Sequence, residues 1–322
     1  MDDLNKYSQR YLRQWDKRAT VRGMKRYRVT KKETAKDLFP ADQQPLATHP
    51  DVTALGKDAV RELLIRTVYK WQGDIAALEV DVVTDLCGKL ANQPVSFDLP
   101  DSARHAALTI GTDEVYHAYA AREFIADVWR HTGVDPEKIA ETEYPILNGL
   151  AYLRQAAPPE LLREAETMAL CFAENFVTES LFGMAKNTEP DNPFHVTMRE
   201  HLIDEGRHQN FFQALMRHMW AGIDEEARVA LGKLIPGFLD AFLLNIGPIR
   251  ESYAEILGFL GFEHERGLEM VTEAYVANHG QWDGRKDNVV FGQRCMNLVK
   301  VANILDHAPT RTAMIESGWV SA

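Results

Sequence analysis

The stretch His201-Leu202-Ile203-Asp204-Glu205-Gly206-Arg207-His208 places two imidazoles and a carboxylate at helical spacing. Each residue of an α-helix turns the chain by about 100°, so positions 201, 205 and 208 lie at about 0°, 40° and 340° around the axis. The side chains of His201, Glu205 and His208 are therefore expected to point in the same direction.

The same spacing recurs earlier in the chain. The stretch Asp113-Glu114-Val115-Tyr116-His117 again pairs a Glu with a His three residues later, and each copy has an Asp directly before the Glu. A further Glu lies in an apolar helical stretch upstream of each copy, Glu79 being 35 residues before Glu114 and Glu174 being 31 residues before Glu205. The chain thus contains the order Glu, then Glu-x-x-His, twice.

This repeated order predicts an all-α protein with a ferritin-like four-helix bundle and additional C-terminal helices. Such bundles hold two metal ions by one Glu from each of two helices and one Glu-x-x-His from each of the other two. A single Glu-x-x-His would be weak evidence, but four carboxylates at apolar core positions need cations or protons to compensate them. A ligand set rich in oxygen with several imidazoles suits iron or manganese, whereas zinc and copper sites favour fewer carboxylates.

Four further side chains have roles that spacing leaves open. His201 can reach the metal that Glu205 and His208 would bind, or it can be a hydrogen-bonded core histidine. Asp113 and Asp204 are expected to accept the outer ring N–H of ligand histidines, the alternative being surface acids beside a ligand. Thr178, one turn after Glu174, faces the site and could donate a hydrogen bond to a bound oxygen species, or it could simply pack between helices.

Apolar periodicity and Gly/Pro breakers predict where the helices lie. The bundle helices are expected over residues 52–92, 101–132, 159–186 and 194–220, with a long crossover at 133–158 that contains a short helix near 146–155. Three regions follow: a basic N-terminal arm (1–50) with at most one short helix, a di-iron bundle (51–222) and C-terminal helices (223–322). The last region, with helices near 224–245, 248–275 and 287–307, is expected to cover the bundle or form a dimer surface.

Composition and charge narrow the class of protein. The chain has 322 residues and a net charge of -11, which argues against a nucleic-acid partner. A mean hydropathy of -0.30 and the lack of an unbroken apolar run of about 20 residues argue against a membrane span. The N-terminus shows no secretory signal, so a cytoplasmic location is expected. Cys87, Cys171 and Cys295 are expected to be reduced core thiols.

One segment runs against the acidic trend. Residues 17–36 contain nine Lys or Arg and one acid, Glu33. Such a segment is expected to be a solvated, mobile arm, or else to attract an acidic carrier protein or an anionic substrate over long range.

The combined pattern of Glu79, Glu114-x-x-His117, Glu174 and His201-x-x-x-Glu205-x-x-His208 resembles the p-aminobenzoate N-oxygenase family of ferritin-like non-haem di-iron oxygenases. The resemblance covers about residues 60–220, and the additional His201 is its most specific part. It implies that one iron takes Glu79, Glu114 and His117, and that the other takes Glu174, His201, Glu205 and His208, with Glu114 and Glu205 as bridges.

The resemblance also implies an activity. Two iron ions, Fe2+ or Fe3+, with manganese as a further possibility, would use O2 as co-substrate to oxidise the nitrogen of a small amine. The amine would be an arylamine or derived from an amino acid, free or carrier-tethered, and the product a hydroxylamine, nitroso or nitro compound of a biosynthetic pathway. An external electron donor is expected because the chain has neither a cysteine cluster nor a nucleotide-binding glycine loop. A homodimer is also expected.

Two other functions would use the same ligands. A di-iron carbon hydroxylase or desaturase would differ only in its substrate. A non-catalytic, ferritin-like iron-binding protein would need about four to five helices, and the helical sequence beyond residue 224 argues against it.

Overall fold

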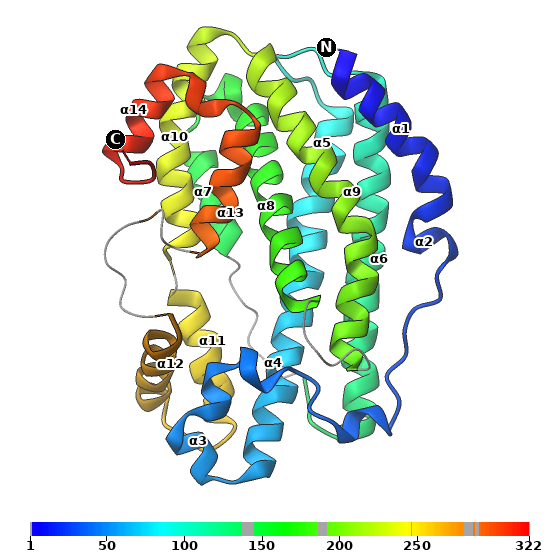
Figure 1. Ribbon diagram of the computed structural model, residues 1–322, viewed down its shortest axis with the longest axis vertical. Helices are drawn as coiled ribbons and strands as arrows, with labels where there is room; N and C mark the ends of the chain where they lie inside the picture. The colour runs from blue at the N-terminus through cyan, green and yellow to red at the C-terminus, as the bar shows by residue number, and fades with distance from the viewer. Residues whose placement is uncertain are drawn as a thin grey trace.

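The computed structural model is an all-α protein built along long, roughly parallel helices (Figure 1). It describes residues 2–136, 145–185, 192–245, 247–279, 286 and 290–321. Every regular element within these ranges is helical, which confirms the predicted all-α, ferritin-like fold.

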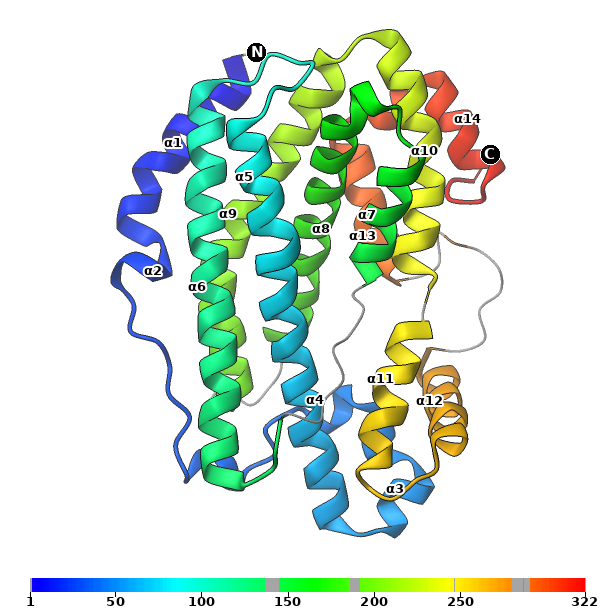
Figure 2. The ribbon, with the colours of Figure 1, turned by 180° about the vertical axis from the view of Figure 1, so that it is seen from behind.

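Two helical hairpins form the bundle. In the first, α4 (Lys57–Ala77) continues through a π-helical segment, η4 (Leu78–Thr84), into α5 (Asp85–Asn92), and all three pack against α6 (Asp101–Thr132). In the second, α8 (Leu162–Ala185) packs against α9 (Pro193–Gly222). The helix α7 (Pro145–Ala156) lies on the crossover and packs against α8, as seen from behind in Figure 2. The bounds predicted from sequence agree closely with α6, α8 and α9.

The first bundle helix differs from the uninterrupted helix that periodicity predicts. Its chain adopts π-helical geometry over η4, and the Thr84 hydroxyl donates a hydrogen bond to the Glu79 carbonyl oxygen at 2.7 Å. A π-turn accommodates an extra residue and changes the direction in which side chains point. Here Glu79 is 1 % exposed and turned into the bundle, whereas the neighbouring Val80 is 45 % exposed.

The hydrophobic core is divided along the bundle axis. One cluster includes Leu86, Ala107 and Phe172 and continues into residues 227–242 and 295–319 of the C-terminal region. The other includes Leu64 and Phe194, at the opposite end of the bundle, and continues into residues 256–274. The predicted metal ligands lie at intermediate positions on the same helices, so a polar layer is enclosed between two apolar ones.

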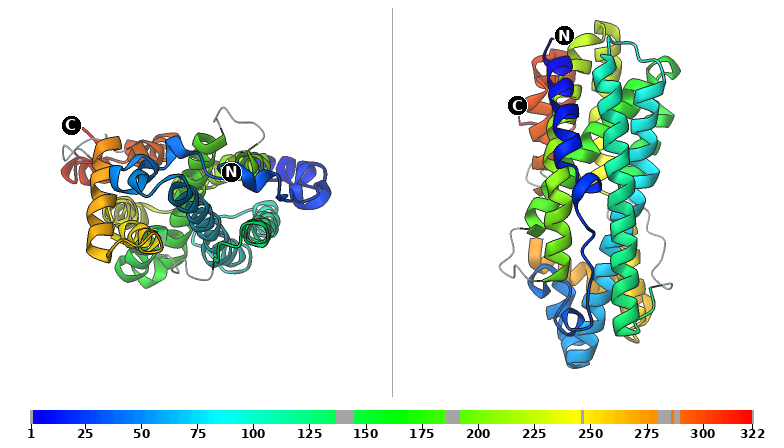
Figure 3. Two further views of the ribbon diagram at one scale, coloured as in Figure 1. Left: turned by 90° about the horizontal axis from the view of Figure 1, so that it is seen from below. Right: turned by 90° about the vertical axis from the view of Figure 1, so that its right-hand side faces the viewer.

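The N-terminal region corrects the expectation of at most one short helix in a solvated arm. The helix α1 (Asp2–Arg18) has 17 residues and packs on α6 and α9, followed by the short α2 (Thr20–Gly23) (Figure 3, right). Leu4 and Tyr11 on α1 are buried, as are Leu38 and Phe39 farther along. The apolar residues of α1 recur every three or four positions, a periodicity that its many charges obscure.

The C-terminal region packs in two groups. The helices α10 (Glu225–Leu243), α13 (Val290–Val301) and α14 (Ala308–Glu316) lie against α7, α8 and each other. The helices α11 (Gly247–Gly258) and α12 (His264–His279) pack together near α3 (Pro50–Ala54) and α4, at the other end of the molecule (Figures 1 and 3). The single helix expected over 248–275 is wrong, because the chain turns at Gly261, which has a φ of +93°.

The three cysteines are buried and free of disulfides. One stretch, Glu225–Gly258, is long and apolar enough by composition to cross a membrane, a test that core helices of soluble proteins also pass. It comprises α10 and α11, and α10 contains Pro236 in its interior and packs against α7.

Candidate metal centre

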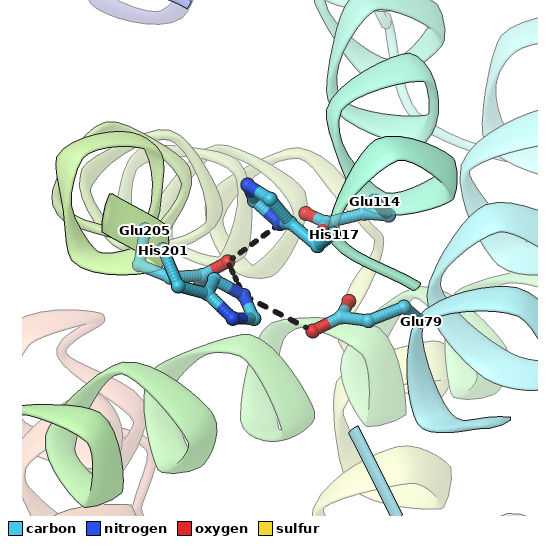
Figure 4. Close-up of side chains that lie close together, drawn as sticks. All are labelled: Glu79, Glu114, His117, His201 and Glu205. Atoms are coloured by element: carbon cyan, nitrogen blue, oxygen red, sulfur yellow. Dashed lines mark hydrogen bonds and ion pairs between the residues drawn. The ribbon is translucent and has the colours of Figure 1, made fainter. Parts of the chain in front are cut away.

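Five buried side chains from three helices form the first potential ligand cluster (Figure 4). They are Glu79 from η4, Glu114 and His117 from α6, and His201 and Glu205 from α9, and one ligand atom of each lies within 4.8 Å of the others. His201 Nε2 is 3.0 Å from Glu205 Oε1 and 3.4 Å from Glu79 Oε1. His117 Nδ1 is 2.9 Å from Glu114 Oε2.

A second cluster lies beside the first. It comprises Glu114, Glu174, Glu205 and His208, again with ligand atoms within 4.8 Å of one another, so that α8 contributes Glu174. His208 Nδ1 is 2.7 Å from Glu114 Oε1 and 3.5 Å from Glu205 Oε1. Glu114 and Glu205 belong to both clusters, which is the position that a carboxylate bridging two metal ions would occupy.

The grouping of His201 differs from the one that the resemblance implies. His201 belongs to the cluster with Glu79 and His117, and its ring centroid is 4.0 Å from that of His117. Helical geometry explains the difference. His201 lies about 6 Å before Glu205 along the α9 axis and His208 about 4.5 Å after it, so the two histidines flank Glu205 on opposite sides.

Burial and crowding of like charges set the protonation of the carboxylates. Burial raises the pKa of Glu79 well above its usual range, and the charges of Glu114 and Glu205 add to this effect. Burial likewise raises the pKa of Glu174, reinforced by Glu205 and Glu114. For Glu114, burial alone would raise the pKa, but the charges of His208 and His117 outweigh it and lower the pKa well below the usual range.

The histidines respond in two ways. Burial opposes protonation of His117, yet Glu114 and Asp204 raise its pKa to about 10. Burial and the nearby charge of His117 lower the pKa of His201. The four buried carboxylates are thus compensated only in part by the positive charge of protonated histidines. Divalent or trivalent cations would replace those protons, because ligand histidines bind metals in the neutral form and ligand carboxylates bind them ionised.

The donor set therefore fits two metal ions. Four carboxylates and three imidazoles divide into two overlapping clusters, each buried in the bundle core. This oxygen-rich set with some nitrogen ligands is typical of iron or manganese rather than zinc or copper.

Two aspartates accept hydrogen bonds from the outer ring nitrogens of the histidines, and each of these bonds joins α6 to α9. His117 of α6 has its Nε2 3.1 Å from Asp204 Oδ2 of α9, and His208 of α9 has its Nε2 3.2 Å from Asp113 Oδ2 of α6. Both aspartates are 0 % exposed, so neither is a surface acid. Because an ionised carboxylate only accepts, each ring donates through Nε2 and leaves Nδ1 facing the carboxylate cluster.

The N-terminal helices supply partners that sequence reasoning missed. Trp15 Nε1 donates to Asp113 Oδ1 at 2.9 Å and to Oδ2 at 3.0 Å. The Thr20 hydroxyl and backbone N–H both donate to Asp204, and Arg207 donates to it as well. The periodicity of α1 could have placed Trp15 on the buried face, but no sequence signal connects it with Asp113.

A buried amide fixes α8 against α9 next to Glu174. Asn175 is 0 % exposed, and its Oδ1 accepts hydrogen bonds from Gln213 Nε2 at 3.0 Å and Gln209 Nε2 at 3.3 Å. Thr178 lies on α8, but its side chain is outside the described part of the structure, and its predicted role stays a prediction.

A pocket leads from the protein surface to the first cluster. It is lined on its inner side by His117 and His201 and on its outer side by Tyr116, Met24 and Glu200. Gln72 also lines it, and this side chain is 1 % exposed with an Nε2 that makes no hydrogen bond to any described residue. The pocket has a cavity volume of about 30 Å³, so its lining side chains would have to move apart before a molecule larger than water could lie beside the cluster.

A comparison with protein families decides the identity of this site. The model of the family described as P-aminobenzoate N-oxygenase AurF matches residues 2–282. The chain belongs to this family. A search of curated proteins gives no match. The match extends well beyond the bundle and includes α1 and most of the C-terminal region.

Family membership and the buried clusters together identify a non-haem di-iron N-oxygenase. This N-oxygenase acts on a small molecule and needs electrons from an external donor. A small-molecule substrate agrees with a pocket that reaches the first cluster from outside.

Proposed function

We propose that this N-oxygenase uses O2 to oxidise the nitrogen of a small arylamine or amino-acid-derived amine in a biosynthetic pathway. The first oxidation balances as R–NH2 + O2 + 2 e− + 2 H+ → R–NHOH + H2O, and repetition gives nitroso and nitro products. When bound, the two iron ions supply the redox chemistry that activates O2. The fold, the family and the donor set of the clusters support this proposal.

The proposed ligands follow from the two clusters. Glu79, His117 and His201 would hold one iron, Glu174 and His208 would hold the other, and Glu114 and Glu205 would be available to both. Asp113 and Asp204 orient His208 and His117 through their Nε2 atoms, which keeps each Nδ1 directed at the metal. Fixing these rings before the metal binds reduces the reorganisation needed during the reaction.

The observation that carries the substrate assignment is the pocket beside His117 and His201. An amine is a hydrogen-bond donor and, when neutral, also an acceptor. The pocket contains both a hydrogen-bond acceptor and a hydrogen-bond donor that could pair with it. The buried Gln72 amide can donate, and the Glu200 carboxyl, whose pKa is raised by partial burial, can accept or hold a proton. We propose that Gln72 and Glu200 position the amine next to the first cluster.

A basic segment at the mouth of the pocket adds a further property. Glu200 also lines a groove with Lys25, Arg26 and Arg28. Positive charge there would raise the local concentration of substrates that carry an acidic group. An amine that carries a negatively charged group therefore fits the entrance better than a cationic one.

The experiment is a comparison of Gln72→Leu with Gln293→Leu, an exposed position on α13. Removal of the buried donor is expected to raise KM for the amine by about tenfold. The iron content and the rate of iron binding should stay unchanged. The control variant should match the wild type. An unchanged KM in Gln72→Leu would show that the amine does not bind in this pocket.

Three further expectations remain proposals. They are a cytoplasmic location, a homodimer, and hydrogen bonding of Thr178 to oxygen bound at the metals.

A further inference from the structure

A hydrogen-bonded chain connects the surface of α1 with the second cluster. Trp15 Nε1 donates to Asp113 at 2.9 Å, Asp113 Oδ2 lies 3.2 Å from His208 Nε2, and His208 Nδ1 lies 2.7 Å from Glu114 Oε1. His208 is fully buried, whereas Trp15 is only half-buried. Trp15 is therefore an aromatic ring near the solvent that is linked, through Asp113, to a histidine of the proposed metal site.

The surface around Trp15 has the opposite charge to the protein as a whole. Residues 4–28 contain nine Lys or Arg and one acid, Asp16, a local charge of +8 in a chain of net charge -11. Lys17, Arg18 and Arg22 are exposed, and the Arg22 guanidinium lies over the Trp15 ring at 5.2 Å from its centroid. We call the surface formed by residues 4–28 the basic face.

The basic face and the chain of Trp15, Asp113 and His208 beneath it together suit the transfer of electrons from a partner protein. Tunnelling between redox groups weakens steeply with distance, so a donor must approach the metals closely or be connected to them through bonds. A cationic surface attracts anionic partners and speeds their encounter. Complementarity of charge thus points to an acidic protein, and the aromatic chain beneath the surface points to a redox protein.

We propose that the basic face is the docking site of a small acidic one-electron carrier protein, and that Trp15, Asp113 and His208 conduct its electrons to the metal held by His208. The inference rests on the proposed di-iron function. Two reduced carriers each lose one electron per turnover, and each electron reduces one Fe3+ to Fe2+. The indole provides the coupling path and is not itself reduced.

The corresponding path on the other side of the site is closed. Asp204 is enclosed by Thr20 and Arg207, and Thr20 is 2 % exposed. Apart from the ligand histidine His117, no aromatic side chain among the described residues is hydrogen-bonded to Asp204. The difference between the two aspartates is what directs the inference to Trp15.

The first test measures binding without metal or turnover. Metal-free protein is titrated calorimetrically with a plant-type ferredoxin, an acidic one-electron carrier, at low and high salt. Lys17→Glu with Arg18→Glu should weaken binding by about tenfold or more and reduce its salt dependence. The matched control, Lys233→Glu with Lys300→Glu, makes the same charge change on α10 and α13 and should bind like the wild type.

The second test measures electron transfer in the iron-loaded, oxidised protein. Under anaerobic stopped-flow conditions, Trp15→Phe should slow reduction by ferredoxin by about tenfold or more. Reduction by a small diffusible viologen radical should keep its wild-type rate, because that reductant does not need the basic face. Trp129→Phe, at a 44 % exposed position near the end of α6, is the control and should leave both rates unchanged.

Several outcomes would overturn the proposal. An unchanged ferredoxin rate in Trp15→Phe, or equal slowing with both reductants, would show that Trp15 is not the electron path. Binding of an acidic acyl-carrier protein without binding of ferredoxin would assign the basic face to substrate delivery. A wild-type protein that binds iron and is reduced by viologen radical would preserve the di-iron function in each case. Failure of the wild type to bind iron would refute both proposals.

Discussion

The helices α6 and α9 carry the same Asp-Glu-x-x-His motif, but their surroundings differ. Asp113 of α6 accepts hydrogen bonds from Trp15, whose ring reaches toward the solvent. Asp204 of α9 is closed off by the Thr20 hydroxyl, the Thr20 backbone N–H and Arg207. The α9 copy also has His201 one turn before its Glu, an addition that α6 lacks.

The comparison distinguishes the features that the α6 and α9 motifs have in common from those that belong to one motif only. The carboxylates and crossed His–Asp pairs are matched because two metal ions need similar ligands. The outer partners are free to differ, since they act through the aspartates rather than on the metals directly. The symmetric part of the site therefore concerns metal binding, and the asymmetric part concerns access from outside.

Removing one of the two carboxylates shared by both clusters should have the largest effect. Glu205→Ala takes a ligand from both proposed iron sites, so iron content should fall from about two to below about one per chain and N-oxygenation should be lost. Iron analysis after anaerobic loading and a product assay measure this. Glu226→Ala, at an exposed position on α10, is the control. Full iron loading in Glu205→Ala would contradict the shared role.

The asymmetry of His201 is tested by comparison with His208. His201→Ala should remove the iron held with Glu79 and His117, and His208→Ala the iron held with Glu174, so each variant should retain about one iron per chain. Iron titration followed by absorption spectroscopy distinguishes the two remaining sites. Retention of two iron ions with wild-type affinity in His201→Ala would make His201 a core histidine rather than a ligand.

The matched pair Asp113→Asn and Asp204→Asn tests the outer partners. Each variant should weaken iron binding by about 10- to 100-fold, because each frees a ligand histidine from its brace. Only Asp113→Asn should also slow reduction by ferredoxin more than reduction by viologen radical. Equal rates of ferredoxin reduction in the two variants would remove the functional difference between the two sides.

The smallest effect is expected from removing a single hydrogen bond to Asp204, the aspartate that has no path to the surface. Thr20→Val removes a hydroxyl that donates to a buried, ionised aspartate, but the Thr20 backbone N–H still donates to it. The free energy of unfolding should fall by about 1–3 kcal/mol, measured by urea denaturation of the metal-free protein. Thr112→Val, at an exposed position on α6, should change it little. An unchanged stability of Thr20→Val would mean that Asp204 does not depend on this cap.

The sequence was sufficient for the parts of the molecule that follow helical periodicity. Residues 79, 114, 117, 174, 201, 205 and 208 are brought together as their spacing on four helices predicts. The pattern identified the family because an extra histidine one turn before a Glu-x-x-His is a local feature of one helix. Such local features do not depend on how the helices are arranged in space.

The remaining features depend on tertiary structure. The π-turn at Glu79 results from competition between backbone hydrogen bonding and packing, and no residue type encodes it by itself. Trp15 and Thr20 are about 100 and 180 residues from Asp113 and Asp204, and a separation of that size leaves no periodic trace in the sequence. The division of His201 and His208 between two clusters is different, because it follows from the axial order of the ligands on α9, which the sequence contains but a projection around the helix does not display.

The most direct test of the account is a single turnover of the iron-loaded, reduced protein with 18O2 and a panel of arylamines and amino-acid amines, followed by mass spectrometry. We expect about two iron ions per chain and a product with one 18O atom on the amine nitrogen. The wild type should form this product faster than the Gln72→Leu variant. Incorporation of 18O at carbon only, or oxidation of the iron with no amine altered, would contradict it.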